Sequence, residues 1–264
     1  MTRTRPVVAY GLIVLVGIAA FLYPFWVPRT ALPNNAHSGD APLVAAVVGV
    51  LVLTAIALEV RRGTMNGATV ALLGVLSATA GLMRLLSLPG GGNGIFFVVV
   101  LAGAAFGPRF GLLLGLCAMA VSAVITGGVG PWLPFQMLAL GWMGGSAGLI
   151  GQMTRHLRPG AEVAVLVVFG WGWAFVYGAI MNLWFWPFVI GQGPLAWHPG
   201  LSAADILHRY WSFYVVTSLG WDAAGAVTNG VLIALTGLPL LRSMRRFADR
   251  LEPVTEFAAE PSLA

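Results

Sequence analysis

Four polar side chains lie inside long apolar runs of this sequence, where they could bind a small molecule. They are the carboxylate of Asp222, the amides of Asn182 and Gln136, and the guanidinium of Arg84. Polar side chains inside membrane helices are costly and usually face the interior of the helix bundle. We therefore expect them to meet at a pocket that binds its ligand through hydrogen bonds and charge.

Spacing along the apolar runs indicates which further residues share a face with these four. One helical face of the last run carries Trp211, Ser218, Asp222, Gly225 and Asn229, and the preceding run repeats Gly178, Asn182 and Trp186 every four residues. The candidate binding residues are Arg84, Asn93, Trp132, Gln136, Asn182, Trp186, Tyr214 and Asp222. A structural role for Asp222 stays open, as a hydrogen-bond or ion-pair partner of another helix, for example through Arg84.

Motifs of catalysis are absent or lack their context. Gly144–Gly148 matches the G-x-S-x-G string of serine hydrolases, which requires a strand–turn–helix elbow, whereas this copy lies in an apolar run. The histidines His156, His198 and His208 lack metal-ligand spacing, and no phosphate-binding G-x-x-x-x-G-K-[ST] loop is present. We therefore expect neither enzymatic activity nor a metal or cofactor.

Composition places these residues in a membrane. Hydrophobic residues make up 58% of the 264 positions and charged residues 9%, and Arg109 is the single charge between Ile95 and Gly151. Such a stretch requires hydrocarbon around it. The sequence therefore predicts an all-α, polytopic integral membrane bundle. We attribute its basic character to arginines that contact anionic lipid headgroups, and we expect no nucleic-acid partner.

Apolar runs between turn signals predict about eight transmembrane helices. They span 7–27, 42–60, 68–88, 95–106, 110–125, 135–153, 163–190 and 210–241. The first run ends in an aromatic anchor, Tyr23–Trp26, so we interpret it as a retained helix and not a cleaved signal peptide. Most arginines fall on one side, which predicts a plasma-membrane protein with both termini in the cytoplasm.

The fourth run is too short to cross a bilayer as a helix. Its twelve residues would rise only about 18 Å, and Pro89–Gly94 before it cannot easily be helical. Irregular backbone at membrane depth must be covered by protein or line a wet cavity. We expect a recess near Gly90–Gly94 that opens to the outside, with the loops at 127–134 and 191–209 at its rim. Alternatively, the helix starts earlier.

Small residues form a stripe along the third run. Gly67, Ala71, Gly74, Ala78 and Gly81 repeat at spacings of four and three. Such stripes let another helix approach closely. The partner is either a helix of this chain or a separate subunit.

Two local patterns, Phe106-Gly107-Pro108 and the segment from Gly128 to Met137, resemble those of energy-coupling factor (ECF) transporter S components, in particular the vitamin-type members that include cobalamin transporters. Phe106-Gly107-Pro108 resembles the turn that joins two spans in that family, and Gly128–Met137 resembles its Gly-x-Gly-Pro-Trp-x-Pro-x-Gln-Met element. The resemblance covers about 67–241. It divides the chain into an N-terminal hairpin (1–62), a six-helix core (63–247) and a tail (248–264).

The resemblance implies a substrate-specificity subunit that captures a vitamin at the outer face. Its partners would be a membrane coupling subunit, contacted through Ala71, Gly74 and Ala78, and two cytoplasmic ATPases. Cobalamin is the favoured vitamin, and riboflavin or another flat vitamin is the alternative. A membrane scaffold without a ligand and a membrane enzyme remain as other classes.

Overall fold

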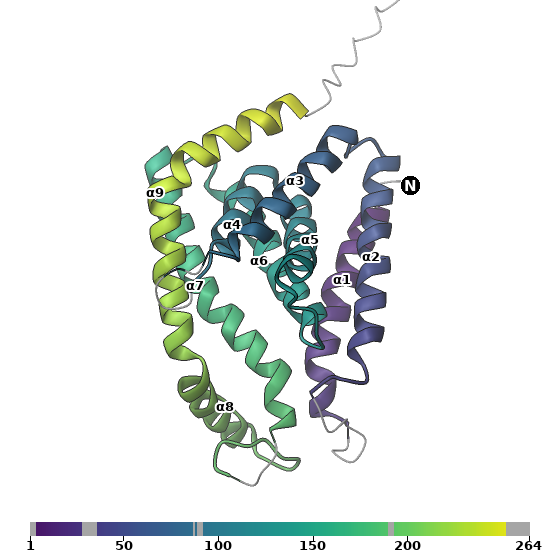
Figure 1. Cartoon of the computed structure of the whole chain (residues 1–264), viewed down its shortest axis with the longest axis vertical. Helices are drawn as coiled ribbons and strands as arrows, with labels where there is room; N and C mark the ends of the chain where they lie inside the picture. Colours follow the sequence, from purple (N-terminus) through teal and green to yellow (C-terminus); the bar gives the residue numbers. More distant parts are fainter. Residues whose placement is uncertain (1–3, 28–35, 87, 89–91, 190–192, 252–264) are drawn as a thin grey trace, which may run out of the picture.

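The computed structural model of the chain describes residues 4–27, 36–86, 88, 92–189 and 193–251, and within these residues it is helical and contains no strand. Nine α-helices follow one another in the described residues (Figure 1). They are α1 (Thr4–Leu22), α2 (Ala41–Arg61), α3 (Gly67–Met83), α4 (Ile95–Phe106), α5 (Pro108–Thr126), α6 (Leu133–Thr154), α7 (Pro159–Phe185), α8 (Ala203–Thr217) and α9 (Leu219–Leu251).

Length and composition fit a membrane protein. Among the described helices, α1, α2, α5, α7 and α9 are long and apolar enough to cross a membrane, and α3 and α4 are shorter apolar helices. Large apolar side chains are exposed around the bundle, including Leu15, Leu53, Val75, Val168 and Leu235. Water would not tolerate so much exposed apolar surface, whereas lipid does. The predicted all-α polytopic membrane bundle is confirmed.

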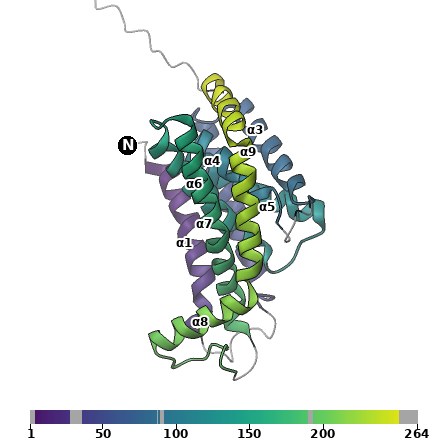
Figure 2. The same cartoon turned by 90° about the vertical axis from the view of Figure 1, so that its left-hand side faces the viewer.

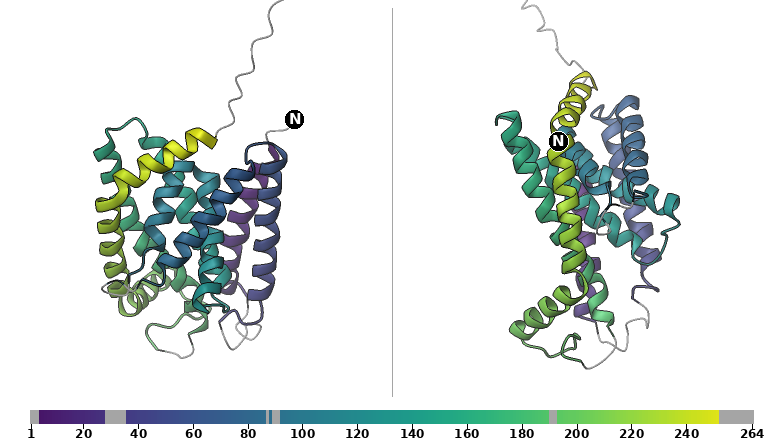
Figure 3. Two further views of the ribbon diagram at one scale, coloured as in Figure 1. Left: turned by 45° about the horizontal axis from the view of Figure 1, so that its top comes forward. Right: turned by 60° about the vertical axis from the view of Figure 1, so that its left-hand side comes forward.

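The α1–α2 hairpin forms one flank of the bundle, and α7 and α9 form the opposite flank (Figures 1 and 3). The helices α4, α5 and α6 lie between these flanks and pack on one another. We call the end where α1 begins and α9 stops the termini end. The opposite end, where α8 lies, is the α8 end (Figure 2).

The short helix α4 is the centre of the bundle. It begins at Ile95 and ends at Phe106, so the predicted twelve-residue helix is confirmed and does not start earlier. Residues 97–105 are all buried, and α5, α6 and α9 pack against the helix. Gly107, with φ of +94°, ends α4, and Pro108 begins α5. A helix too short to span the bilayer is thus enclosed by protein.

Glycines let the central helices approach backbone to backbone. A Cβ atom added to Gly144 of α6 would overlap the carbonyl oxygen of Gly111 in α5, and one added to Gly111 would overlap that of Gly144. A Cβ atom on Gly103 of α4 would also meet the carbonyl oxygen of Gly144. Close approach through small residues replaces the hydrophobic effect as the source of helix association in lipid.

The last predicted span, 210–241, is wrong as a single helix. The helix α8 ends at Thr217 and α9 begins at Leu219, and Figure 2 shows α8 lying across the α8 end. Trp211, on α8, is 60% exposed and does not share a face with Asp222. The apolar run continues through the bend at Ser218, so periodicity alone gave no sign of the change in helix direction.

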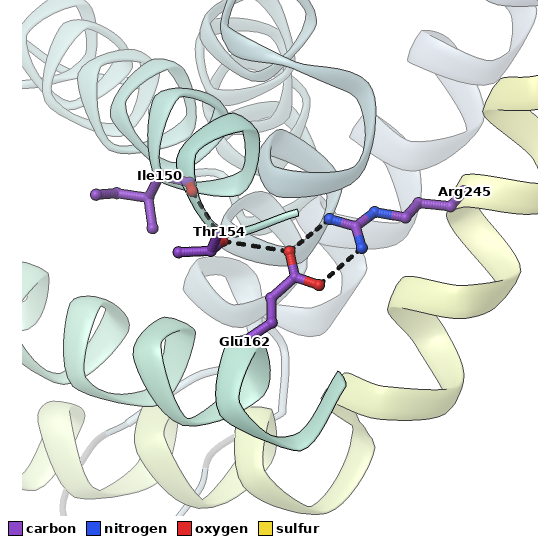
Figure 4. Close-up of polar contacts among 4 residues, drawn as sticks. All are labelled: Ile150, Thr154, Glu162 and Arg245. Atoms are coloured by element: carbon purple, nitrogen blue, oxygen red, sulfur yellow. Dashed lines mark hydrogen bonds and ion pairs between the residues drawn. The ribbon is translucent and has the colours of Figure 1, made fainter. Parts of the chain in front are cut away.

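An ion pair joins three helices at the termini end (Figure 4). The guanidinium of Arg245 in α9 donates to both carboxylate oxygens of Glu162 in α7, over 2.7 Å and 2.5 Å. The Thr154 hydroxyl of α6 lies 3.2 Å from Glu162 Oε1. Glu162 is 2% exposed, so its charge depends on these partners.

Candidate functional site

A cavity of about 560 Å³ lies near the α8 end, between the start of α6, the second half of α7 and the bend between α8 and α9. Its walls combine flat aromatic rings with a few polar groups. They are formed by Trp132, Gln136, Tyr177, Gly178, Met181, Asn182, Trp184, Phe185, Phe213, Thr217, Ser218 and Asp222. Its volume lies in the range of small-molecule sites, and it is wide open to the surroundings of the bundle.

The start of α6 supplies one wall. The indole nitrogen of Trp132 donates to the carbonyl oxygen of Gly128 over 3.2 Å, which fixes the tryptophan ahead of the helix. Pro134 lies in the first turn of α6, where the missing N–H of proline costs nothing. Gln136 follows in the same turn and faces the cavity.

The opposite wall is held by hydrogen bonds across α7, α8 and α9. The Asn182 amide donates to the Ser218 hydroxyl over 2.7 Å. The Tyr214 hydroxyl donates to Asp222 Oδ2 over 2.9 Å. The Asp222 carboxylate lies against Gly178, where any Cβ atom would overlap it. The bend at Ser218 therefore brings α8 and α9 polar groups onto the same cavity.

Two polar atoms of the cavity wall have no hydrogen-bond partner among the described residues. They are Gln136 Oε1 and Trp184 Nε1, and both are buried. A buried polar group without a partner costs about 1–3 kcal/mol, so such groups require an explanation. Six further buried polar atoms of the described residues also have no partner and lie on residues outside this cavity, so the feature alone does not indicate a ligand.

Four of the predicted binding residues meet at this cavity: Trp132, Gln136, Asn182 and Asp222. Tyr214 does not line the cavity, but its hydroxyl donates to Asp222, which does. The binding role of these residues stays a prediction.

The other three predicted binding residues lie elsewhere. Arg84 contacts Met119 Sδ at 3.3 Å and Ser122 Oγ at 3.5 Å, so the proposed Arg84–Asp222 pair is not formed. Asn93 accepts a hydrogen bond from the Ile95 N–H over 3.2 Å, at the start of α4. Trp186 does not line the cavity: it is 1% exposed and packs in an aromatic cluster with Trp197 and Phe213, of which only Phe213 reaches the cavity wall.

The predicted recess falls partly outside the described residues. Within them, Gly92 and Gly94 are buried, packed against Thr228 and Met83. Of the two predicted rim loops, 127–134 contributes Trp132 to the cavity, whereas the described part of 191–209 contributes nothing to it.

Tyr177, Trp184 and Ser218 line the cavity but were missed. The sequence held one signal for Ser218, which shares a helical face with Asp222. The tryptophan and tyrosine resemble ordinary aromatic residues at a membrane interface.

The stripe on α3 is largely uncovered. Gly67, Ala71 and Gly74 are exposed and Ala78 is half-buried. Only the last member, Gly81, packs closely within the chain, against the Ser122 backbone of α5.

Catalytic and metal chemistry find little support in the described residues. Ser146 lies within α6 and bonds the Trp142 carbonyl oxygen over 2.6 Å, so the G-x-S-x-G string is helical, as expected, and not an elbow. No group of three or more His, Cys, Asp or Glu residues lies close enough to hold a metal ion, within the same described ranges.

Comparison with known families gives one match. Residues 68–237 match the family model described as the substrate-specific component of ECF transporters. Comparisons with curated proteins and with solved structures gave no match. The hairpin of α1 and α2 precedes the matched residues.

Proposed function

The chain belongs to the family of ECF transporter substrate-specific components, and we propose on this basis that it captures a vitamin at the outer face of the membrane. It is a multi-pass membrane transport subunit, and its family works with membrane and ATPase modules. We further propose one membrane coupling subunit and two cytoplasmic ATPase subunits as its partners.

The observation that supports capture is the lining of the cavity, where the amides of Gln136 and Asn182 lie among aromatic rings. Such a combination of apolar walls and a few polar groups is typical of ligand sites. The Asp222 carboxylate on the same cavity adds a further acceptor.

We propose cobalamin as the vitamin. The aromatic walls suit a flat ring system, and the acceptors Gln136 and Asp222 suit the N–H donors of its peripheral carboxamides. The cavity contains no arginine among its lining residues, which disfavours a ligand recognised through a carboxylate or phosphate. Riboflavin, which has a flat uncharged ring system, is the alternative ligand in the same assay.

The purified chain is expected to bind cobalamin saturably in detergent without its partners. Replacing Gln136 by alanine should weaken binding by about tenfold, because a hydrogen bond in a desolvated site contributes on the order of 1.4 kcal/mol. Equilibrium titration of both proteins measures the effect.

Gln152→Ala is the matched control, since Gln152 is exposed near the end of α6. Binding of riboflavin alone would overturn the cobalamin assignment. A chain that binds neither vitamin, yet copurifies with a stable partner complex, would favour the scaffold.

The orientation follows from arginines that the helix ends bring to the termini end. They include Arg61, Arg109, Arg155, Arg242 and Arg246, whereas Arg84 and Arg209 lie toward the α8 end. An excess of arginine marks the cytoplasmic side. We therefore propose that both termini are cytoplasmic and that the cavity is near the outer face.

We propose the exposed part of the α3 stripe as the docking site of the coupling subunit. Ala71→Trp should abolish copurification with the coupling subunit, because a bulky side chain prevents close helix approach. Cobalamin binding by the isolated chain should be unchanged, since Ala71 is outside the cavity.

The control for this prediction is Val50→Trp on α2, at a position that is 63% exposed. A coupling complex that survives Ala71→Trp and is lost with Val50→Trp would place the docking site on the hairpin instead.

A further inference from the structure

His37 lies between α1 and α2, yet its side chain has no exposed surface. Its backbone φ is +56°, in the left-handed region that residues with a Cβ atom rarely adopt. Such a conformation persists only where the surroundings over-determine it. Specific contacts therefore hold this residue in place.

Both ring nitrogens of His37 face hydrogen-bond acceptors. Nδ1 lies 2.7 Å from Asp40 Oδ2, and Nε2 lies 3.1 Å from the carbonyl oxygen of Trp184. Burial raises the pKa of the Asp40 carboxyl, but hydrogen bonding to His37 and Tyr23 outweighs it and brings the pKa below its usual value. Nδ1 thus faces a carboxylate oxygen and Nε2 faces a backbone carbonyl oxygen, so polar contacts hold the His37 ring on two sides.

Four aromatic rings form a cage around His37. Their centroids lie 4.3 Å (Phe135), 4.6 Å (Phe188), 5.7 Å (Trp184) and 5.8 Å (Tyr23) from that of His37. The Trp184 ring is stacked, at an interplanar angle of 20°. These ring contacts pack the imidazole on several sides and, with its two polar contacts, fix its position.

Trp184 connects this cage to the cavity. Its carbonyl lies in the last turn of α7, where the helix provides no N–H partner, so His37 satisfies that carbonyl from another part of the chain. The residue also lines the cavity, and its indole nitrogen is one of the two partnerless atoms there. His37 thus contacts both the backbone and the ring of one cavity residue.

We propose that His37 is a positioning residue of the substrate site, which holds the Trp184 indole in the cavity wall. The N-terminal hairpin then contributes a positioning residue to the site, although it lies outside the family match of residues 68–237. This role rests on the proposed function, because it matters for transport only if the cavity binds the substrate.

The test is fluorine NMR of the full chain labelled with 5-fluorotryptophan, with the Trp184 resonance assigned by Trp184→Phe. His37→Phe keeps an aromatic ring and removes both hydrogen bonds. We expect it to shift the Trp184 resonance and to leave those of Trp171 and Trp221 in place, since these are 48% and 70% exposed. Cobalamin affinity should fall by about tenfold, because the hydrogen bond from His37 to the Trp184 carbonyl no longer orders the wall.

His208→Phe is the matched control, at an exposed position of α8, and should change neither quantity. If His37→Phe does not yield folded protein, Asp40→Asn replaces it: this variant keeps the His37 ring but changes the group that contacts Nδ1, and should shift the same resonance. A Trp184 resonance that stays in place in the folded variant overturns the proposal. So does a shifted resonance with unchanged cobalamin affinity.

The two proposals fail in different ways. A wild-type chain that binds neither cobalamin nor riboflavin removes the proposed function and, with it, the transport role of His37. The Trp184 resonance then still decides whether His37 holds this ring.

Discussion

The substitution Gly144→Ala is expected to separate the central helices of the bundle and to lower its stability more than any surface substitution. The added Cβ atom would overlap the carbonyl oxygen of Gly111 and contact Val99. Neither backbone can retreat without disturbing α4, which packs on both α5 and α6. Overpacking of this kind costs typically about 1–3 kcal/mol and occasionally more, and we expect the upper end because the clash is with backbone.

The measurement is the apparent Tm of the detergent-solubilised chain, which should fall by roughly 10 °C. Gly172→Ala is the matched control, because a Cβ atom at this helical position of α7 meets nothing within 4 Å. The control should be neutral or slightly stabilising, since alanine is the better helix former. Equal Tm values for the two variants would contradict the backbone packing described here.

Removal of the Glu162 carboxylate is expected to have the second large effect. Glu162→Ala would leave the Arg245 guanidinium, 21% exposed, without its partner, and Thr154 without its second contact. Breaking a buried ion pair by removing one member costs about 3–5 kcal/mol, because the remaining charge stays uncompensated. The ends of α7 and α9 should separate, which limited proteolysis near Arg245 and the apparent Tm would both detect.

Two further variants separate the loss of the pair from the loss of a single charge. Glu162→Leu combined with Arg245→Met should recover most of the stability, because two apolar side chains replace a pair whose burial is itself costly. Arg242→Met removes a neighbouring arginine that is exposed and should leave the Tm unchanged. If the double variant were as unstable as Glu162→Ala, the cause would be packing and not charge.

Most helix positions could be predicted from the sequence, since hydrocarbon leaves the backbone few alternatives to helices. The short helix at Ile95–Phe106 is an example: its length was readable from the Pro89–Gly94 segment before it and the Gly107-Pro108 turn after it. Its burial was not predicted, because irregular backbone at membrane depth is either covered by protein or lines a wet cavity, and we expected a recess beside it; the structure instead buries residues 97–105. The G-x-S-x-G string was interpreted as a site of helix packing because it lies in an apolar run. Its first residue, Gly144 of α6, indeed contacts the backbone of Gly111 in α5.

The candidate site was predictable only in part. Gln136, Asn182 and Asp222 were found because each is a polar group in an apolar run, and all three line the cavity. Trp186 and Trp132 gave the same sequence signal, yet Trp186 belongs to a different aromatic cluster and Trp132 lies at the cavity. The sequence could not distinguish these two tryptophans, because their neighbours in space depend on how the helices pack.

Sequence alone determined that the chain resides in lipid, that its helices pack through glycine, and that its few polar groups are costly enough to need a purpose. These properties follow from composition and from spacing along one helix. Only the tertiary structure decided that the chain bends at Ser218 and that His37 reaches Trp184, a residue 147 positions away. Helical periodicity describes neighbours on one straight helix, whereas a bend and a contact between distant segments depend on how whole helices pack.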